Sequence, residues 1–236
     1  MIQAADEIIA GKFRDQFITD VIQGGAGTSM NMNMNEVIAN RANEILGGEL
    51  GKYDRCHPND HVNYGQSTND VVPTAGKLTV QLLIKDLLTD LQYLYDTLQA
   101  KGNEFDHVIK MGRTHLQDAV PIRLGQEFRA FSQPVLRDIK RISAAVEELT
   151  YVNMGATAVG TGINADVEYV KNVVRILSEV TGFEFKQSPD LVDGTRNLDS
   201  FVWLSSALKT CAVNLSKTAN DIRLMASGPK AGLAEI

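Results

Sequence analysis

The sequence has little cysteine, no long hydrophobic run and fewer basic than acidic residues. Its two cysteines, Cys56 and Cys211, lie far apart and form no metal-binding or redox spacing, so we expect reduced thiols. No apolar stretch approaches the roughly 18 residues that cross a bilayer. Residues 1–7 have neither the basic nor the apolar region of a secretory signal. These absences predict a cytoplasmic protein without a membrane span.

The charge balance argues against nucleic acid as a partner. Lysine and arginine together number 23 and aspartate and glutamate 29, which gives a net charge of −6. Phosphate binding needs a basic face, and the basic residues here are scattered along the chain. Hydrophobic residues make up 44% and charged residues 22% of the sequence, as is ordinary for soluble globular proteins.

Three segments carry apolar residues at alternating three- and four-residue steps. These stripes run from Val80 to Leu98, from Phe128 to Leu149 and from Phe201 to Ile222. The spacing is typical of long helices that pack side by side at shallow angles. A helix of about 30 residues spans roughly 45 Å, which favours a bundle extended by oligomerisation. Pro134 lies inside the second stripe and is expected to kink that helix.

The rest of the chain contains few strand-like patterns. Residues 166–180 read as a further amphipathic helix that ends at Thr181-Gly182, because glycine accepts the left-handed C-cap conformation. Glycine-bearing polar connections separate the helices, and such loops commonly carry chemistry. They cover residues 23–34, 57–69, 110–121 and 153–164. The predicted fold class is therefore all-α.

The first candidate segment is Gly24–Asn33. Its glycines allow the backbone to approach a ligand, and Thr28 and the residues after it supply hydroxyl and amide groups. The same pattern also fits a glycine turn that leads into a helix. It is not a nucleotide-binding fingerprint, because no strand precedes it and the lysine of a phosphate loop is missing.

The second candidate region joins His57–Asn63 to Gln66–Asp70. Two histidines four residues apart would suit zinc, but Pro58 interrupts the continuous helix that such a pair needs, so we predict no metal. The run Ser67-Thr68-Asn69 either caps the long helix that follows Pro73 or holds a carboxylate with its hydroxyls and the helix-start amides.

The third candidate segment is Gly112–Ala119. His115 follows Thr114 in a polar loop, where a histidine can position a donor or shuttle a proton. A structural histidine is the alternative.

In this order the segments resemble those of the aspartase/fumarase superfamily, and the resemblance covers essentially the whole chain. The matching stretches are Asn31–Val37, His57–Asn63, Gln66–Asp70, Gly112–Ala119, Thr157–Gly162 and Ala219–Leu224. The resemblance implies that residues 1–236 form one central helical domain, which contributes long helices to the multi-helix core of a homotetramer with active sites shared between subunits.

Finer details resemble aspartate ammonia-lyases more than class II fumarases. They are Gly24–Ser29, Ser67-Thr68-Asn69, Met154–Thr157 and Met225–Pro229. The implied reaction is reversible anti elimination of ammonia from L-aspartate to give fumarate, without a metal or an organic cofactor. A class II fumarate hydratase, which converts L-malate to fumarate, and a non-catalytic helical assembly domain are the alternatives.

The resemblance also implies roles for individual residues. Thr28 and Asn69 would contact the amino group or its neighbouring carboxylate. Ser67, Thr68 and Thr114 would hold carboxylate oxygens. His115 would bind and orient the substrate or transfer a proton. A second dicarboxylate site would be formed by His57, Pro58, Asn59 and Asp60.

The same resemblance places the catalytic base on a serine-bearing loop that follows residues 228–235, together with a lysine and an asparagine that bind substrate. Because the sequence contains neither this loop nor most of the family's amino-terminal domain, we expect the isolated chain to be inactive.

Overall fold

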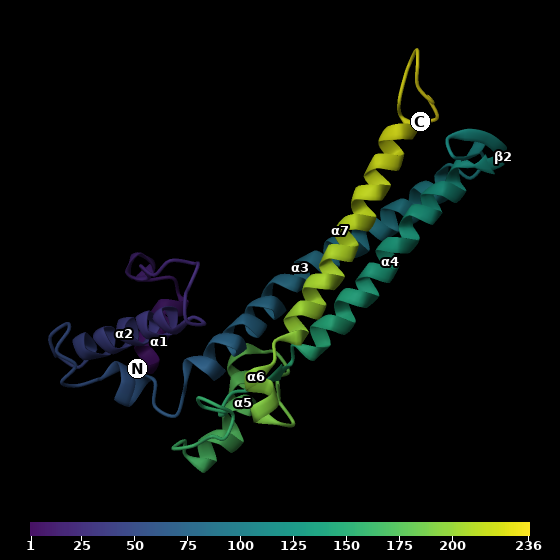
Figure 1. Ribbon diagram of the computed structural model, residues 1–236. Coiled ribbons are helices and arrows are strands. Elements are labelled where there is room, and N and C mark those ends of the chain that lie inside the picture. Colours follow the sequence, from purple (N-terminus) through teal and green to yellow (C-terminus); the bar gives the residue numbers. More distant parts are fainter. The chain divides into compact units, whose positions relative to one another are not determined.

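The chain folds into two compact units. A computed structural model describes residues 1–236. One unit consists of residues 1–79 and 150–197, and the other of residues 80–149 and 198–236. Helix α3 (Thr68–Glu104) begins in the first unit and continues into the second (Figure 1).

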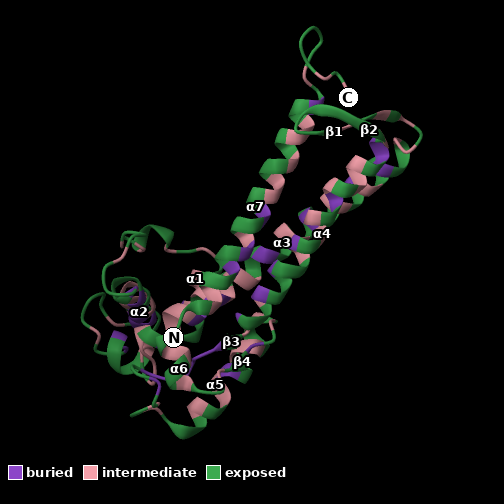
Figure 2. Ribbon diagram, turned by 45° about the vertical axis from the view of Figure 1, so that its right-hand side comes forward, coloured by how far each residue is buried: buried purple, intermediate pink, exposed green.

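The second unit is built on long helices. It contains the later part of α3 together with α4 (Leu124–Glu148) and α7 (Asp199–Met225), and α4 and α7 lie side by side. Residues of all three predicted stripes meet in one apolar core, seen as the buried positions along these helices in Figure 2. Its buried members are Ile84, Leu91, Leu98, Val135, Ile142, Ala145, Leu149, Leu204, Ala207 and Cys211. The prediction of packed long helices is confirmed.

A two-stranded ribbon connects α3 to α4, where the sequence patterns predicted only a loop. Strand β1 (Ile109–Thr114) pairs antiparallel with β2 (Gln117–Arg123). All residues of both strands are exposed or only half-buried; exposure alternates over the first four residues of β1, but β2 shows no period-two alternation. A register shift between Met111 and Arg113 interrupts the pairing.

The first unit begins with helices that pack around a small core. These are α1 (Ile2–Ile9), the 3-10 helix η1 (Arg14–Gln16), α2 (Thr28–Ile45) and the π-helical turn η2 (Pro58–Val62). The core residues Ala4, Ala39, Ala42 and Cys56 come from α1, α2 and the segment before η2.

The later part of the first unit has its own core. It comprises β3 (Tyr151–Val152), α5 (Val167–Thr181), β4 (Lys186–Gln187) and α6 (Leu191–Arg196). Strands β3 and β4 pair in parallel. The buried apolar residues here are Val152, Met154, Val174 and Phe185.

Local signals explain how two of these helices begin and end. Asp166 caps the start of α5 by accepting from two backbone N–H groups, and Gly182 ends the helix in the left-handed conformation at φ 74°, as predicted. Helix α3 begins at Thr68, ahead of Pro73 and therefore earlier than expected. Since Pro73 has no N–H, it leaves the carbonyl of Asn69 free, and the amide of Asn153 donates to that carbonyl at 3.0 Å.

The helical fold class is confirmed by this arrangement. None of the helices combines the length and the apolar character that a membrane crossing requires.

Candidate functional site

The first unit contains a polar pocket of about 370 Å³ beside the start of α3. It is lined by Asn31, Met32, Asn63, Gly65, Gln66, Ser67, Thr68, Thr157, Ala158, Ile163, Asn164 and Ala165. None of these side chains is charged. An anion bound here would therefore rely on neutral hydrogen-bond donors and on the positive end of the α3 helix dipole.

Ser67 and Thr68 each accept one hydrogen bond from the protein. Ser67 Oγ accepts from the backbone N–H of Asn69 at 3.2 Å, and Thr68 Oγ1 accepts from the amide of Asn31 at 3.1 Å. Neither hydroxyl donates to an acceptor within the chain. Because a hydroxyl carries one proton, both O–H groups remain available to donate to a ligand.

Thr28 and Asn69 show the opposite polarity. The hydroxyl of Thr28, the first residue of α2, donates to the carbonyl of Gly25 at 2.8 Å. The amide nitrogen of Asn69 donates to the carbonyl of Ala158 at 2.7 Å. Thr28 Oγ1 therefore retains lone pairs to accept a further hydrogen bond, and the Asn69 Oδ1 can accept as well.

A buried face of α2 holds the pocket's hydrogen-bonding groups in place. The amides of Asn31 and Asn35 both donate to Asn63 Oδ1, at 3.3 and 3.0 Å, and Asn31 also reaches Thr68. We assigned no separate role to these two asparagines from the sequence. A usable signal was present, because they lie four residues apart and line up with Ala39, at positions that would face a core.

Asp70 lies behind the pocket and is fully buried. Its two carboxylate oxygens accept the backbone N–H groups of Ser67 at 2.9 Å and of Thr157 at 3.0 Å. Burial raises the pKa of Asp70 above its ordinary value, although these and other backbone N–H groups oppose the shift. Burial, followed by the charge of Asp70, raises the pKa of Tyr169 to about 12, so this phenol stays neutral.

Thr114 and His115 lie in the second unit, at the exposed tip of the β1–β2 ribbon. Thr114 pairs with Gln117, so His115 and Leu116 form the two-residue turn, with φ values of 51° and 61°. This left-handed region is uncommon for residues other than glycine, although histidine is among the types enriched there, so the strained residue of the turn is Leu116. Such strain is often found at functional sites.

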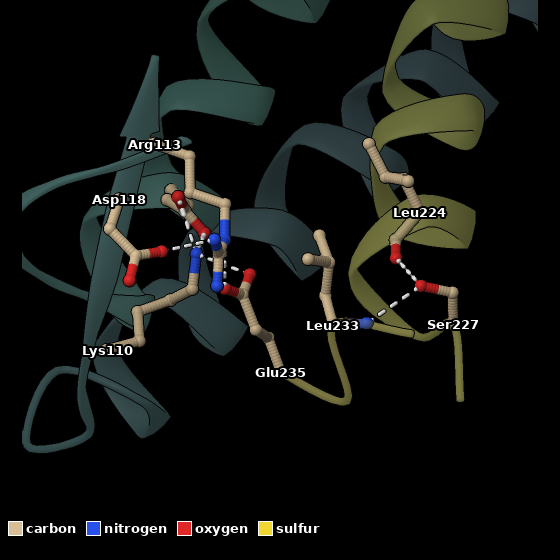
Figure 3. A network of polar contacts seen from close by, with 8 residues as sticks. Lys110, Arg113, Asp118, Leu224, Ser227, Leu233 and Glu235 are labelled. Atoms are coloured by element: carbon tan, nitrogen blue, oxygen red, sulfur yellow. Dashed lines mark hydrogen bonds and ion pairs between the residues drawn. The ribbon is translucent and has the colours of Figure 1, made fainter. Parts of the chain in front are cut away.

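Ionic contacts hold the base of this ribbon (Figure 3). Glu235 pairs with Lys110 at 2.8 Å and with Arg113 at 2.9 Å. Arg113 also pairs with Asp118 at 2.5 Å, and Lys110 with Glu127 at 2.8 Å. Arg113 immediately precedes Thr114, so the network fixes the backbone that leads into the candidate residues.

The segment predicted to form a second dicarboxylate site surrounds the start of η2. His57 Nδ1 accepts the backbone N–H groups of Asn59 and Asp60, both at 3.2 Å. The same ring nitrogen lies 3.4 Å from an oxygen of Asp60, but a nitrogen that accepts two N–H groups carries no proton, so this contact is not an ion pair. The N–H groups that would bind a carboxylate here already have a partner within the chain, and the site stays a prediction.

The structure thus brings Ser67 and Thr68 together in one pocket and places Thr28 and Asn69 in the same unit. Asn69 follows Thr68 directly, and Thr28 precedes Asn31 by one helical turn. Thr114 and His115 belong to the other unit.

Comparison with known proteins gives consistent matches over the full sequence. A family model described as lyase matches residues 1–236. The chain is 58% identical over 236 residues to an aspartate ammonia-lyase of Bacillus subtilis and 48% identical over 237 residues to that of Escherichia coli, covering 100% of this chain and 50% of each relative. The chain therefore spans about half the length of the curated relatives it matches.

Solved structures agree with the sequence matches. A fumarate lyase:delta crystallin from Brucella melitensis bound to cobalt superimposes with a TM-score of 0.95 at 50% identity, covering 99% of this chain and 51% of that one. A class II fumarase from Schistosoma mansoni superimposes with a TM-score of 0.93 at 33% identity, covering 98% of this chain and 52% of that one.

Proposed function

Since the chain belongs to the lyase family over all of residues 1–236, we propose that the full-length protein that contains it is an aspartate ammonia-lyase. The reaction is the reversible anti elimination of ammonia from L-aspartate to give fumarate. The relatives at 48–58% identity over the whole chain support this assignment.

The polarity of the site carries the proposal. Ser67 and Thr68 present O–H donors, as a carboxylate requires. Thr28 and Asn69 present oxygen acceptors, as an ammonium group requires. A substrate that carries both an ammonium group and carboxylates matches this set in polarity, and L-aspartate has its ammonium group and one carboxylate on Cα and its second carboxylate on the adjacent Cβ.

The donors also suit the chemistry of the elimination. Loss of the proton next to the side-chain carboxylate gives an aci-carboxylate, which carries additional negative charge on its oxygens. Neutral donors fixed in advance stabilise this species more than the substrate, and each contributes about 2–4 kcal/mol. Ser67, Thr68 and Thr114 are the donors we assign to carboxylate oxygens, and His115 to binding and orienting the substrate or transferring a proton.

The direct test follows the ultraviolet absorbance of fumarate. Full-length protein is supplied with L-aspartate and, separately, with L-malate, and ammonia is measured in parallel. We expect fumarate and ammonia from L-aspartate. Fumarate from L-malate alone would reject the proposal in favour of a fumarate hydratase, the candidate supported by the likeness to the Schistosoma mansoni enzyme.

Substitution of the donors tests the assigned roles. We expect Ser67→Ala and Thr114→Ala each to lower kcat/KM for L-aspartate by roughly 10²- to 10³-fold, because each removes a donor to the developing charge. Thr79→Ala is the matched control, since Thr79 is exposed on α3 and donates only to the carbonyl of Ala75. Full activity in both site variants would show that Ser67 and Thr114 do not hold the substrate carboxylate.

We further propose that the full-length protein is a cytoplasmic homotetramer that shares its active sites between subunits. The helices of the second unit expose large apolar side chains that the unit's own core does not cover, including Leu83, Tyr93 and Val202. Exposed apolar surface of this kind favours association. Sedimentation of the full-length protein tests the proposal: we expect a tetramer, and a stable monomer would reject it.

A further inference from the structure

Asp70 joins two segments that lie far apart in the sequence. One oxygen accepts the N–H of Ser67 at 2.9 Å and the other accepts the N–H of Thr157 at 3.0 Å. Both of these residues line the polar pocket. The carboxylate therefore connects the wall formed by the start of α3 to the wall formed by residues 157–165.

The hydrogen bond from Thr157 to Asp70 is not part of the cap at the start of α3. Ser67 Oγ accepts from the N–H of Asn69, and Asp70 accepts from the N–H of Ser67, which is the reciprocal pattern of a capping box. A cap uses only nearby backbone groups. Asp166 and Asp190, which cap α5 and α6, each accept two N–H groups from their own helix and none from another segment.

The segment that Asp70 holds has an unfavourable backbone conformation. Thr157 has φ 60°, and a β-branched residue in the left-handed region is strained by about 1–3 kcal/mol. Its hydroxyl is buried and has no hydrogen-bond partner. Neither feature stabilises this conformation. The N–H of Thr157 is held by Asp70, and the neighbouring Ala158 is held by the amide of Asn69, which donates to its carbonyl at 2.7 Å.

A carboxylate without a cation is a costly group to bury. Asp70 is fully buried, and its two oxygens accept backbone N–H groups. Tyr169 is the titratable group that interacts with it from α5, and the phenol is neutral. A neutral amide or an alanine would fill this position at lower cost if packing were the only requirement.

We propose that Asp70 is a positioning residue, which fixes the pocket by holding Ser67 and Thr157 at a set separation so that the O–H groups of Ser67 and Thr68 point at the substrate carboxylate. This inference rests on the proposed function, because it assigns Asp70 to the same substrate-binding pocket.

The test is Asp70→Asn in the full-length protein, with Asp190→Asn as the matched control. An asparagine can accept only one of the two N–H groups and turns its own NH₂ toward the other, so one wall is released. We expect kcat/KM for L-aspartate to fall roughly 10- to 100-fold with a raised KM, since displacement of binding groups by about 1 Å costs that much. Asp190→Asn also loses an aspartate cap in the same unit, and we expect its KM to stay within about twofold of the unmodified protein.

Hydrogen exchange provides a readout that does not depend on turnover. We expect the amides of Ser67 and Thr157 to be protected in the unmodified protein and at least one of them to exchange faster in Asp70→Asn, with the amides of α5 unchanged. Unchanged protection of both amides would overturn the proposal. Faster exchange with unaltered kcat/KM would overturn it equally, because the contact would then be structural only.

Failure of the proposed function and failure of the variant to fold can each be distinguished from failure of the Asp70 proposal. If the unmodified protein does not turn over L-aspartate, the proposed function fails, and Asp70 is then tested by the binding of succinate as a dicarboxylate probe. Weaker succinate binding in Asp70→Asn would support positioning, and equal or undetectable binding in both proteins would overturn it. If Asp70→Asn does not fold, Asp70→Glu replaces it. Glutamate keeps the carboxylate but adds one methylene, which changes the separation of Ser67 and Thr157, so we expect kcat/KM or succinate affinity to fall roughly tenfold, and no change would overturn the proposal.

Discussion

The two units of the molecule bury very different kinds of side chain. The second unit buries almost exclusively apolar residues, with Ser132 and Asp138 as the polar exceptions. The first unit buries a large set of polar residues, which comprises Asn31, Asn35, Asn43, Asp70, Thr74, Lys77, Asn153 and Thr157. Burial of polar groups is favourable only when each one finds a partner, so the first unit depends on specific pairs and the second on matching apolar surfaces.

This difference in buried side chains fits a second unit that acts as a helical scaffold and a first unit that contains the polar pocket. Apolar stripes tolerate exchange among side chains of similar volume. A polar pocket does not, because a donor left without an acceptor costs more than an average hydrogen bond contributes. Substitutions should therefore destabilise the second unit through lost apolar packing and the first unit through polar groups left without partners.

The largest expected effect is a cavity in the second unit. Ile142 is fully buried in the core of the helix bundle, and Ile142→Ala is expected to destabilise the protein by about 2–5 kcal/mol through lost burial and a residual cavity. Urea unfolding measures the change. Val180→Ala on exposed α5 is the control and should stay within about 0.5 kcal/mol of the unmodified protein. Equal effects would mean that the stripe does not form the core.

A somewhat smaller effect is expected from the polar core of the first unit. Asn43 is fully buried, donates to the carbonyls of Ala39 and Cys56, and accepts the N–H groups of Arg55 and Cys56. Asn43→Ala leaves backbone groups without partners and should cost about 2–4 kcal/mol. The half-buried Asn172 donates to the carbonyl of Glu168 and accepts from Arg175, and Asn172→Ala should change the free energy of unfolding by less than about 1 kcal/mol, because both of these bonds are at the surface. If Asn43→Ala lowered the free energy of unfolding by no more than Asn172→Ala does, the stability of the first unit would not depend on specific polar pairs.

Most of the second unit could be predicted from the sequence because its signals are periodic. The stripes beginning at Val80, Phe128 and Phe201 specify which helix faces meet. The β1–β2 ribbon was not predicted, since the alternation in β1 covers only four residues and β2 has none. The start of α3 ahead of Pro73 was missed for a similar reason: its compensation by Asn153 is a tertiary contact between residues 84 positions apart.

The candidate site was only partly visible in the sequence. Ser67, Thr68 and Thr28 stood out because hydroxyls next to glycines and helix starts suit anion binding. Their polarity was not visible, because it depends on which partner occupies each hydroxyl, and Asn31 reaches Thr68 across 37 positions. The bridge from Asp70 to Thr157 was hidden likewise, because it spans 87 positions.

The two units also surround a carboxylate differently. Asp70 in the first unit has only backbone N–H partners, and its burial raises its pKa. Burial also acts to raise the pKa of Glu235 in the second unit, but hydrogen bonds and charge from Lys110 and Arg113 outweigh it and lower the pKa. The arrangement around Glu235 is seen in Figure 3. Burial thus decides the direction of the pKa shift at Asp70, whereas two cations decide it at Glu235.

The smallest expected effect follows from these opposite shifts. Glu235, with a folded pKa below the ordinary 4.5, contributes stability that is present above that value and is lost as the pH falls through the folded pKa. Asp70, with a folded pKa above the ordinary 3.8, contributes stability that is present below that value and is lost as the pH rises through the folded pKa. Urea unfolding between about pH 3 and pH 6 compares each variant with the unmodified protein. The stability difference for Glu235→Gln should shrink toward acid, whereas that for Asp70→Asn should shrink toward neutral pH. If both stability differences changed in the same direction with pH, either Asp70 would have a cationic partner or Glu235 would not be paired with Lys110 and Arg113.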